Sequence, residues 1–278
     1  MLRDISKRAK SFYNNYKLIK KYKRIAKILK NDIDKNYYDV NKKESNKIFV
    51  CWFQGMENAP EIVKLCYNSL IKYNSNSEII VITEDNFADY VEFPKFIMDK
   101  YKKGCISKTH FSDLLRLELL IKYGGTWVDS TLFFTDKIPD YILNSDLFMF
   151  QSFIEHNGGT DAISSWFISS CANNKLLILE KELLYQFWSK NNKLKNYFLF
   201  HLFFNKIVIK LYNEEWEKVV INDNLSPKIL DCYLFKRFDS QLYTIIKEKS
   251  FAHKFMYKYP QEYFLKEGTF YKYLLEIN

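Results

Sequence analysis

Three polar residues recur at every third position within an apolar stretch of the sequence: His110, Asp113 and Arg116. On a helix this spacing places their side chains along one stripe, next to one another. Asp129 follows after two glycines and a short apolar run. Carboxylates close to a cation can bind a divalent ion and an anionic substrate, so these residues are candidates for an active site.

These residue types suit a nucleotide-sugar site built around a divalent ion. Asp129 would meet the ion and the ribose or diphosphate, Arg116 and Lys254 would bind the diphosphate, and Asp113 would hold sugar hydroxyls. Such a site must stabilise a departing nucleoside diphosphate, whose negative charge is met by a metal or by fixed cations. Oxygen ligands beside a phosphate favour Mg²⁺ or Mn²⁺.

Each of these residues also has a purely structural interpretation. Asp113 and Arg116 could form a buried ion pair without any function. Asp129 could be a turn residue, and His253 could be an ordinary core or surface histidine. The combination of a polar helix stripe, a double glycine and a strand-end carboxylate within one short segment favours a site.

The elements that position these residues can be predicted from the same segment. Ser107 or Thr109 can cap the start of a helix, and Gly124–Gly125 ends it. The strand that follows, over residues 126–128, carries Asp129 at its C-terminal end. Open α/β sheets bind their ligands at that edge.

A β-α-β unit precedes this segment, with strands at 48–53 and 78–83 and a helix that begins near Pro60. Such a unit implies parallel strands and a right-handed crossover. Neither G-x-G-x-x-G nor G-x-x-x-x-G-K-[ST] occurs, which argues against dehydrogenases and P-loop enzymes. Further elements are predicted as a helix at 94–103, strands at 132–134, 146–150 and 164–169, and helices at 176–188, 196–212 and 214–219.

The formal net charge of +9 is concentrated at the N-terminus. Residues 1–30 hold eleven Lys or Arg and one acidic residue, a balance of +10, so the rest of the chain carries −1. A nearly neutral main domain argues against nucleic acid as a partner. The five cysteines are scattered and form no C-x-x-C pair, and most of them lie in apolar surroundings, which indicates reduced core residues of a cytosolic protein. We expect neither a spanning helix nor a signal peptide.

Residues 1–30 are apolar at steps of three and four, which predicts an amphipathic helix with a basic outer face. This helix could lie on an anionic membrane surface, or it could dock on its own domain or a partner chain. A polar linker is predicted at 31–46. We therefore divide the chain into a basic helix with its linker, residues 1–46, and a main domain, residues 47–278.

The segment from Phe111 to Asp129, with Ser-Asp-Leu-Leu-Arg and Tyr-Gly-Gly-Thr-Trp-Val-Asp, resembles sugar-transferring enzymes with a DxD motif. These include the capsular polysaccharide synthesis glycosyltransferases and the related Och1-like mannosyltransferases. The similarity to the capsular group extends over roughly residues 47–258, including 50–55, Trp166 and 250–254. It implies a GT-A fold, which is a Rossmann-like α/β domain with a mixed central sheet, here with a helical C-terminal region.

The resemblance also implies roles for residues. Asp113, Arg116 and Asp129 would be the catalytic residues, and Asp129 would be the first carboxylate of the DxD motif. The implied donor-binding residues are Trp52, Phe53, Gln54, His110, Asp113, Arg116, Gly125, Trp127, Asp129, Ser130 and Lys254.

One position departs from the two-carboxylate pattern. Thr131 stands where the second Asp of DxD would be, and a hydroxyl is a poorer metal ligand. The expected ligands of Mn²⁺ or Mg²⁺ are therefore Asp129 and His253, with Thr131 as a further candidate.

The sequence thus predicts a glycosyltransferase with a nucleoside-diphosphate-sugar donor, UDP-sugar being favoured over GDP-sugar. The resemblance implies a retaining, metal-assisted reaction on a lipid-linked or oligosaccharide acceptor of capsular or surface polysaccharide. We expect a cytoplasmic protein that lies peripherally on the inner face of the membrane through its basic helix. The alternative is a GT-A-like protein without activity that binds or assembles polysaccharide.

Overall fold

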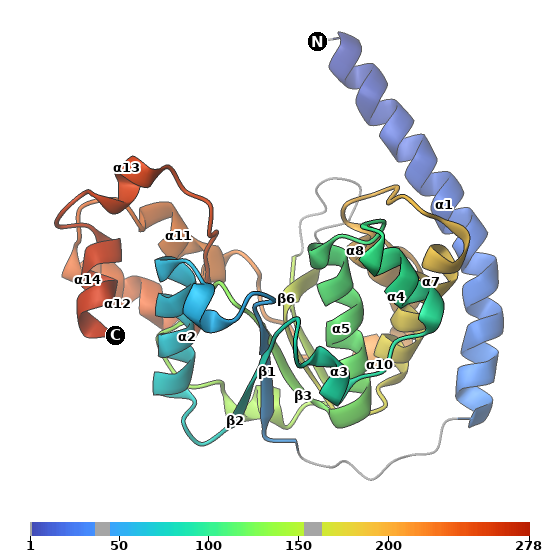
Figure 1. The fold of residues 1–278 in the computed structure, drawn as a ribbon, viewed down its shortest axis with the longest axis horizontal. Coiled ribbons are helices and arrows are strands. Elements are labelled where there is room, and N and C mark those ends of the chain that lie inside the picture. Colours follow the sequence, from blue (N-terminus) through green and yellow to red (C-terminus); the bar gives the residue numbers. More distant parts are fainter. Residues whose placement is uncertain (1, 37–44, 153–162) are drawn as a thin grey trace.

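A computed structural model describes residues 2–36, 45–152 and 163–278, with side chains in the first range from residue 12 (Figure 1). At its centre is a mixed five-stranded sheet with the order β2-β1-β3-β6-β5. β1 is parallel to both β2 and β3, whereas β6 is antiparallel to β3 and β5. The strands are β1 Lys47–Cys51, β2 Glu78–Ile82, β3 Gly125–Asp129, β5 Leu147–Gln151 and β6 Ile163–Ser170.

A second, two-stranded sheet joins distant parts of the chain. β4 Leu132–Phe134 pairs in antiparallel fashion with β7 Ala252–Lys254, so that Leu132 lies opposite Lys254. The strand at 132–134 was expected from the sequence, but its partner was not. This pairing brings a C-terminal segment next to the residues that follow β3.

Helices cover both faces of the central sheet (Figure 1). α5 Lys108–Tyr123 and α7 Lys175–Lys190 lie on one face, and α2 Glu61–Tyr73 lies on the other. Neighbouring side chains of β3 follow this division, because Trp127 packs in the core of α5 and α7 while Val128 packs in the opposite core.

Shorter helices complete the fold. α3 and α4 follow β2, α6 precedes β5, and the C-terminal helices pack together with α2 around a second core. Their bounds are α3 Phe87–Tyr90, α4 Lys95–Lys102, α6 Asp140–Leu143, α10 Asn213–Trp216, α11 Ile229–Tyr233, α12 Ser240–Lys249, α13 Gln261–Phe264 and α14 Phe270–Ile277.

The N-terminal helix α1 spans Leu2–Asn36 and packs along α7. Leu18, Tyr22 and Ala26 are buried in the same core as α5 and α7. The Tyr22 ring lies 4.8 Å from that of Phe203. The linker predicted from residue 31 was placed too early, because Ile33 continues the docked stripe and the helix runs on to residue 36. The rest of that linker, 37–44, falls outside the described residues.

The predicted α/β class with a mixed sheet is confirmed, together with the N-terminal helix and the helical C-terminal region. The first strand ends at Cys51 and not at residue 53, because the chain turns where the Gly55 N–H donates to the Trp52 carbonyl, 2.9 Å away. Within the described ranges, no helix is long and apolar enough to cross a bilayer.

The helix predicted at 196–212 is interrupted. It begins only at Leu199, because the Asn196 side chain accepts a hydrogen bond from the Phe198 N–H, 2.7 Å away, and forms a turn there. It consists of α8 Leu199–Phe203, a π-helical turn Phe204–Val208 and α9 Ile209–Leu211.

Candidate active site

The carboxyl ends of β1 and β3 lie side by side, because Cys51 pairs with Asp129 in the parallel register. The segment Trp52–Gln54 leaves β1 directly beside that carboxylate. Ser130 and Thr131 leave β3 at the same edge. This is the edge at which open α/β sheets bind ligands, so the predicted residues of both segments are brought together.

Helix α5 presents the predicted polar stripe at this edge. Its first residues are capped by Ser107, whose hydroxyl accepts from the His110 N–H. The His110 Nδ1 atom lies 3.4 Å from Asp113 Oδ2, and Arg116 Nη2 lies 3.3 Å from Asp113 Oδ1. The stripe therefore consists of one carboxylate held between an imidazole and a guanidinium.

Arg116 links the helix stripe to the strand-end carboxylate. Its Nη2 atom lies 3.7 Å from Asp129 Oδ1, its Nη1 donates to the Ser165 carbonyl, and its Nε donates to the Ser112 carbonyl at 3.2 Å. The guanidinium carbon lies 4.9 Å from the centre of the Trp127 ring. A guanidinium held on several sides has a fixed direction, which suits recognition of phosphate or carboxylate.

Asp129 has a cation on each side and an edge open to solvent. Its Oδ1 accepts a hydrogen bond from Trp127 Nε1 at 3.0 Å, and its Oδ2 lies 3.8 Å from Lys254 Nζ. The side chain retains 29% of its exposure. A carboxylate that is oriented in this way but still reachable can bind a ligand, which a buried structural ion pair cannot do.

Lys254 reaches the site through the β4–β7 pairing. Its ammonium group donates to the Thr131 hydroxyl and to the Phe255 carbonyl, the latter at 3.1 Å. The sequence predicted a role for Lys254 on a weak motif, and the structure now places it beside Asp129.

His253 lies next to Lys254 in sequence but points elsewhere. It is fully buried, and its Nε2 atom lies 3.2 Å from the Thr135 hydroxyl. Burial lowers the pKa of His253 to about 3. The structure does not bring this predicted metal ligand to the carboxylate of Asp129.

The double glycine allows helix α5 and strand β3 to approach their neighbours closely. Gly125 has φ +94, and a Cβ atom there would lie 2.4 Å from the Lys47 carbonyl oxygen. Gly124 has φ +65, and a Cβ atom there would lie 2.8 Å from the Ala172 amide. Any larger residue would displace the start of the strand that carries Asp129.

The predicted nucleotide-pocket residues differ in their surroundings. Trp52 is half-buried, with its ring 5.7 Å from that of Tyr257. The centre of the Phe53 ring lies 5.9 Å from that of Phe111 and 5.6 Å from Lys108 Nζ. Gln54 is exposed and Ser130 is half-buried, and both lie at the carboxyl edge of the sheet. Of these four residues only Phe53 is buried, so the other three are accessible to a ligand at this edge.

Asp113 is held in its ionised form. Burial alone would raise the pKa of Asp113, but the Arg116 charge and the His110 hydrogen bond outweigh burial, so its pKa lies below the usual value. This ionised carboxylate can accept hydrogen bonds from hydroxyl groups.

Sequence reasoning missed two residues next to the cluster, Glu180 and Tyr197. Glu180 of α7 is fully buried, and neither of its carboxyl oxygens has a hydrogen-bond partner in the described part of the chain. Burial, and secondarily the Asp113 charge, raise the pKa of Glu180 well above its usual value. Tyr197 places its ring 5.6 Å from that of His110. Glu180 could have been found as the one acid on the apolar face of 176–188.

Among the residues that the structure describes, no three His, Cys, Asp or Glu side chains lie close enough to hold a metal ion by themselves. Asp129 remains a suitable single ligand, since Mg²⁺ often binds through one or two carboxylates and the phosphates of its substrate. Thr131 is 5% exposed and its hydroxyl accepts from Lys254, so it fits this role less well.

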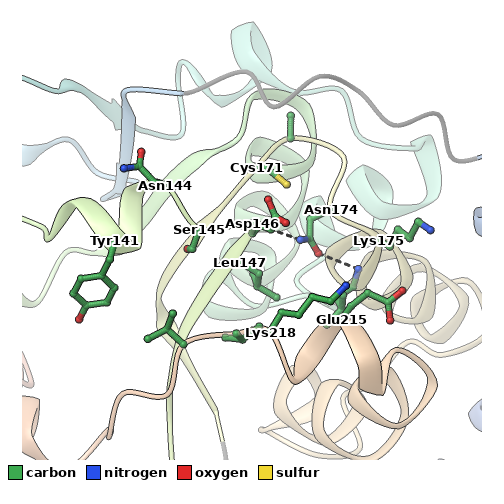
Figure 2. Close-up of a pocket in the computed structure, with 14 residues that line it drawn as sticks. Tyr141, Asn144, Ser145, Asp146, Leu147, Cys171, Asn174, Lys175, Glu215 and Lys218 are labelled. Atoms are coloured by element: carbon green, nitrogen blue, oxygen red, sulfur yellow. Dashed lines mark hydrogen bonds between the residues drawn. The ribbon is translucent and has the colours of Figure 1, made fainter.

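A separate cavity of about 490 Å³ lies at the other end of the sheet (Figure 2). Ser170, at the end of β6, pairs with Gly125 at the start of β3, and the cavity opens beyond that end. Figure 2 shows Asn174 in its wall, donating to the Asp146 carbonyl at 3.0 Å. None of the predicted site residues lines this cavity, so the candidate site remains at the Asp129 edge.

Comparison with known proteins assigns the chain to a family. No curated protein compared with the chain matches it. Among solved structures, the chain is similar to the PaToxG glycosyltransferase, with 16% identity, a TM-score of 0.40, and coverage of 95% of this chain and 98% of that chain. The family model described as "Capsular polysaccharide synthesis protein" matches residues 2–274. As the sequence predicted, the protein belongs to the capsular polysaccharide synthesis family.

Proposed function

We propose that the protein is a glycosyltransferase that moves a sugar from a nucleoside-diphosphate donor onto a capsular or surface polysaccharide intermediate. The observation that carries this proposal is the position of Arg116, which lies between Asp113 and Asp129 at the carboxyl edge of the sheet. Membership of the capsular polysaccharide synthesis family supports it.

The geometry suggests a separate role for each of these side chains. Arg116 and Lys254 flank Asp129 and can bind the diphosphate as its negative charge develops. Asp113 is ionised and lies one turn before Arg116 on α5. There it can accept hydrogen bonds from sugar hydroxyls. Trp52 and Phe53, which follow β1 at the same edge, would contact the nucleotide.

A divalent ion belongs to the proposal because of the charge balance of the cluster. Asp113 and Asp129 offset Arg116 and Lys254, so a bound diphosphate adds negative charge that these four residues leave uncompensated. Mn²⁺ or Mg²⁺, held by Asp129 and the donor phosphates, would supply the compensating charge.

The finer aspects of the reaction rest on further observations. Retention of the anomeric configuration and a UDP-sugar donor are supported by the family resemblance. Asp113 and Asp129 are both paired with cations, so neither is an obvious free base. A lipid-linked acceptor and a position on the inner face of the membrane are supported by the basic N-terminal helix.

Donor hydrolysis tests the proposal directly. The full chain is incubated with Mn²⁺ and a panel of UDP- and GDP-sugars, and released nucleoside diphosphate is measured. Replacing Asp129 by Asn should lower hydrolysis by at least about 100-fold, because an oriented charged group at the reacting phosphate is lost. Chelation should lower the wild-type rate, and added Mn²⁺ should restore it.

Asp99→Asn is the matched control, because Asp99 is exposed on α4, and it should behave as wild type. If the wild-type protein neither binds nor hydrolyses any donor, the protein is better described as an inactive polysaccharide-binding member of its family. An Asp129→Asn variant with unchanged hydrolysis would remove the assigned site.

A further inference from the structure

The outward side of α1 carries features that its docking on the body does not explain. The docked stripe is apolar and continues through the helix at steps of three and four residues. The opposite stripe advances by the same steps and is exposed throughout its length. It consists of Phe12, Tyr16, Lys20, Lys23 and Lys27.

This outward side is strongly cationic. Residues 12–30 contain seven Lys or Arg and no Asp or Glu. The next acidic residues toward the C-terminus are Asp32 and Asp34, and Asp34 pairs with Lys30 at 2.5 Å. A continuous row of cations creates a positive field that attracts an anionic surface.

Three large rings are exposed in the first part of the described helix. Phe12, Tyr13 and Tyr16 retain 69%, 55% and 56% of their exposure. Lys17 Nζ lies 4.4 Å from the centre of the Tyr13 ring. Aromatic rings next to lysines are typical of side chains that enter the headgroup layer of a membrane.

The segment 191–198, between α7 and α8, lies against another side of α1 and adds further cations. It contains two exposed lysines, Lys193 and Lys195, and no acidic residue. Asn196 Nδ2 donates to Asn15 Oδ1 at 3.0 Å and ties the segment to α1. A hollow of about 410 Å³ between them is lined mainly by α1 residues together with Lys195. We call α1 residues 12–27 and segment 191–198 together the interfacial surface.

The interfacial surface borders the candidate active site. Tyr197 is 62% exposed, and its ring lies 5.6 Å from His110, the residue that contacts Asp113. In Figure 1 the N-terminal part of α1 extends beyond the body on the side toward which β1 runs. Through Tyr197, segment 191–198 therefore connects the cationic helix to the candidate active site.

We propose that the interfacial surface binds an anionic lipid bilayer and brings the candidate active site close to it through the exposed Tyr197. A lipid-linked acceptor would then approach the donor sugar beside Tyr197, without leaving the membrane. This acceptor route rests on the proposed function, whereas binding to the bilayer does not. A row of cations with interspersed rings fits an extended anionic layer, into which rings can partition.

Vesicle co-sedimentation with the full chain tests this inference. Wild type should bind vesicles that contain about one-third phosphatidylglycerol and should bind pure phosphatidylcholine vesicles much more weakly. Binding should weaken with salt, because screened charges attract less. The triple variant Lys20→Glu, Lys23→Glu, Lys27→Glu should bind anionic vesicles at least about tenfold more weakly, since each basic residue near the surface contributes to attraction.

A matched triple variant controls for the change in net charge. Lys64→Glu, Lys137→Glu and Lys249→Glu reverse the same number of charges at exposed positions on other elements. This control should bind as wild type. Phe12→Ser with Tyr16→Ser should also weaken binding without changing the charge.

Three results would overturn the inference. The first is that wild type fails to bind anionic vesicles, and the second is that the two charge-reversed triple variants weaken binding equally. The third is that wild type pairs with a second copy through this surface and that the Lys20→Glu, Lys23→Glu, Lys27→Glu variant does not. Circular dichroism checks that each variant is folded. Without vesicles, the Lys20→Glu, Lys23→Glu, Lys27→Glu variant should hydrolyse donor at the wild-type rate. If wild type hydrolyses no donor, the proposed function is refuted, and the vesicle assay still decides whether the surface binds a bilayer.

Discussion

Two consecutive residues of β7 show how the direction of a side chain decides its role. Lys254 points to Thr131 and Asp129, whereas His253 points to Thr135 on the other side of the strand. The sequence offered both residues for the site. Only a partner strand, β4, determines which of the two faces the carboxylate, and a pairing across more than a hundred residues leaves no local signal.

The buried His253 should make the protein sensitive to acid. Its pKa is lowered to about 3 by burial, while the unfolded chain takes up the proton near the ordinary value of about 6.5. This contribution to stability is therefore complete above about pH 6.5 and is lost as the pH falls toward 3. Between about pH 6 and pH 4.5 it should amount to a loss of about 2 kcal/mol.

Urea unfolding at these two pH values measures the effect. From pH 6 to pH 4.5, wild type should lose about 2 kcal/mol more of its free energy of unfolding than His253→Gln does. Glu180 has a raised pKa and opposes the effect in both proteins, so it cancels in the comparison. Equal pH dependence of wild type and variant would show that His253 is protonated in the folded protein.

At the scale of elements, the helix-glycine-strand segment could be predicted because its signals are local. Ser107 caps α5 and the glycine pair ends it, as the sequence indicated. The β-α-β unit was equally clear from its apolar runs. The interruption of 196–212 was not, because an Asn side chain and a π-helical turn leave the apolar spacing almost unchanged.

The backbone at Gly125 gives an element-scale prediction. Gly125→Ala should destabilise the protein by roughly 2–3 kcal/mol, because it combines a strained φ with a Cβ atom 2.4 Å from the Lys47 carbonyl. Donor hydrolysis should fall as well, since β3 must shift and take Asp129 with it. Thermal unfolding and the hydrolysis assay measure the two effects.

Gly104→Ala separates backbone strain from crowding. Gly104 has φ +71, but a Cβ atom there meets nothing within 4 Å. Its cost should be about 1 kcal/mol, from strain alone, and hydrolysis should not change. If both variants lose the same stability and neither loses activity, the close approach at Gly125 does not position the carboxylate.

At the scale of the whole molecule, sequence patterns separate the N-terminal helix from the main domain, whereas the structure packs the helix into the core of that domain. Charge and composition divided the basic helix from a neutral domain. Of the apolar positions in the predicted amphipathic helix, Ile19 to Leu29 face the body, whereas Phe12 and Tyr16 are exposed. The apolar stripe, however, enters the main core between α7 and α8. Periodicity reveals that a helix has an apolar face, but it does not reveal what covers that face.

The docking of α1 predicts that the helix unfolds together with the body. Tyr22 is fully buried, with its ring 4.8 Å from Phe203 and 6.2 Å from Phe187. Tyr22→Ala should lower the free energy of unfolding by about 3–5 kcal/mol, because a large aromatic group is removed from a packed core. Tyr13→Ala, on the exposed side of the same helix, should change it by less than about 0.5 kcal/mol. Denaturant unfolding followed by circular dichroism and tryptophan fluorescence should give one coincident transition. If the body of the Tyr22→Ala variant is as stable as that of wild type, α1 folds independently of it.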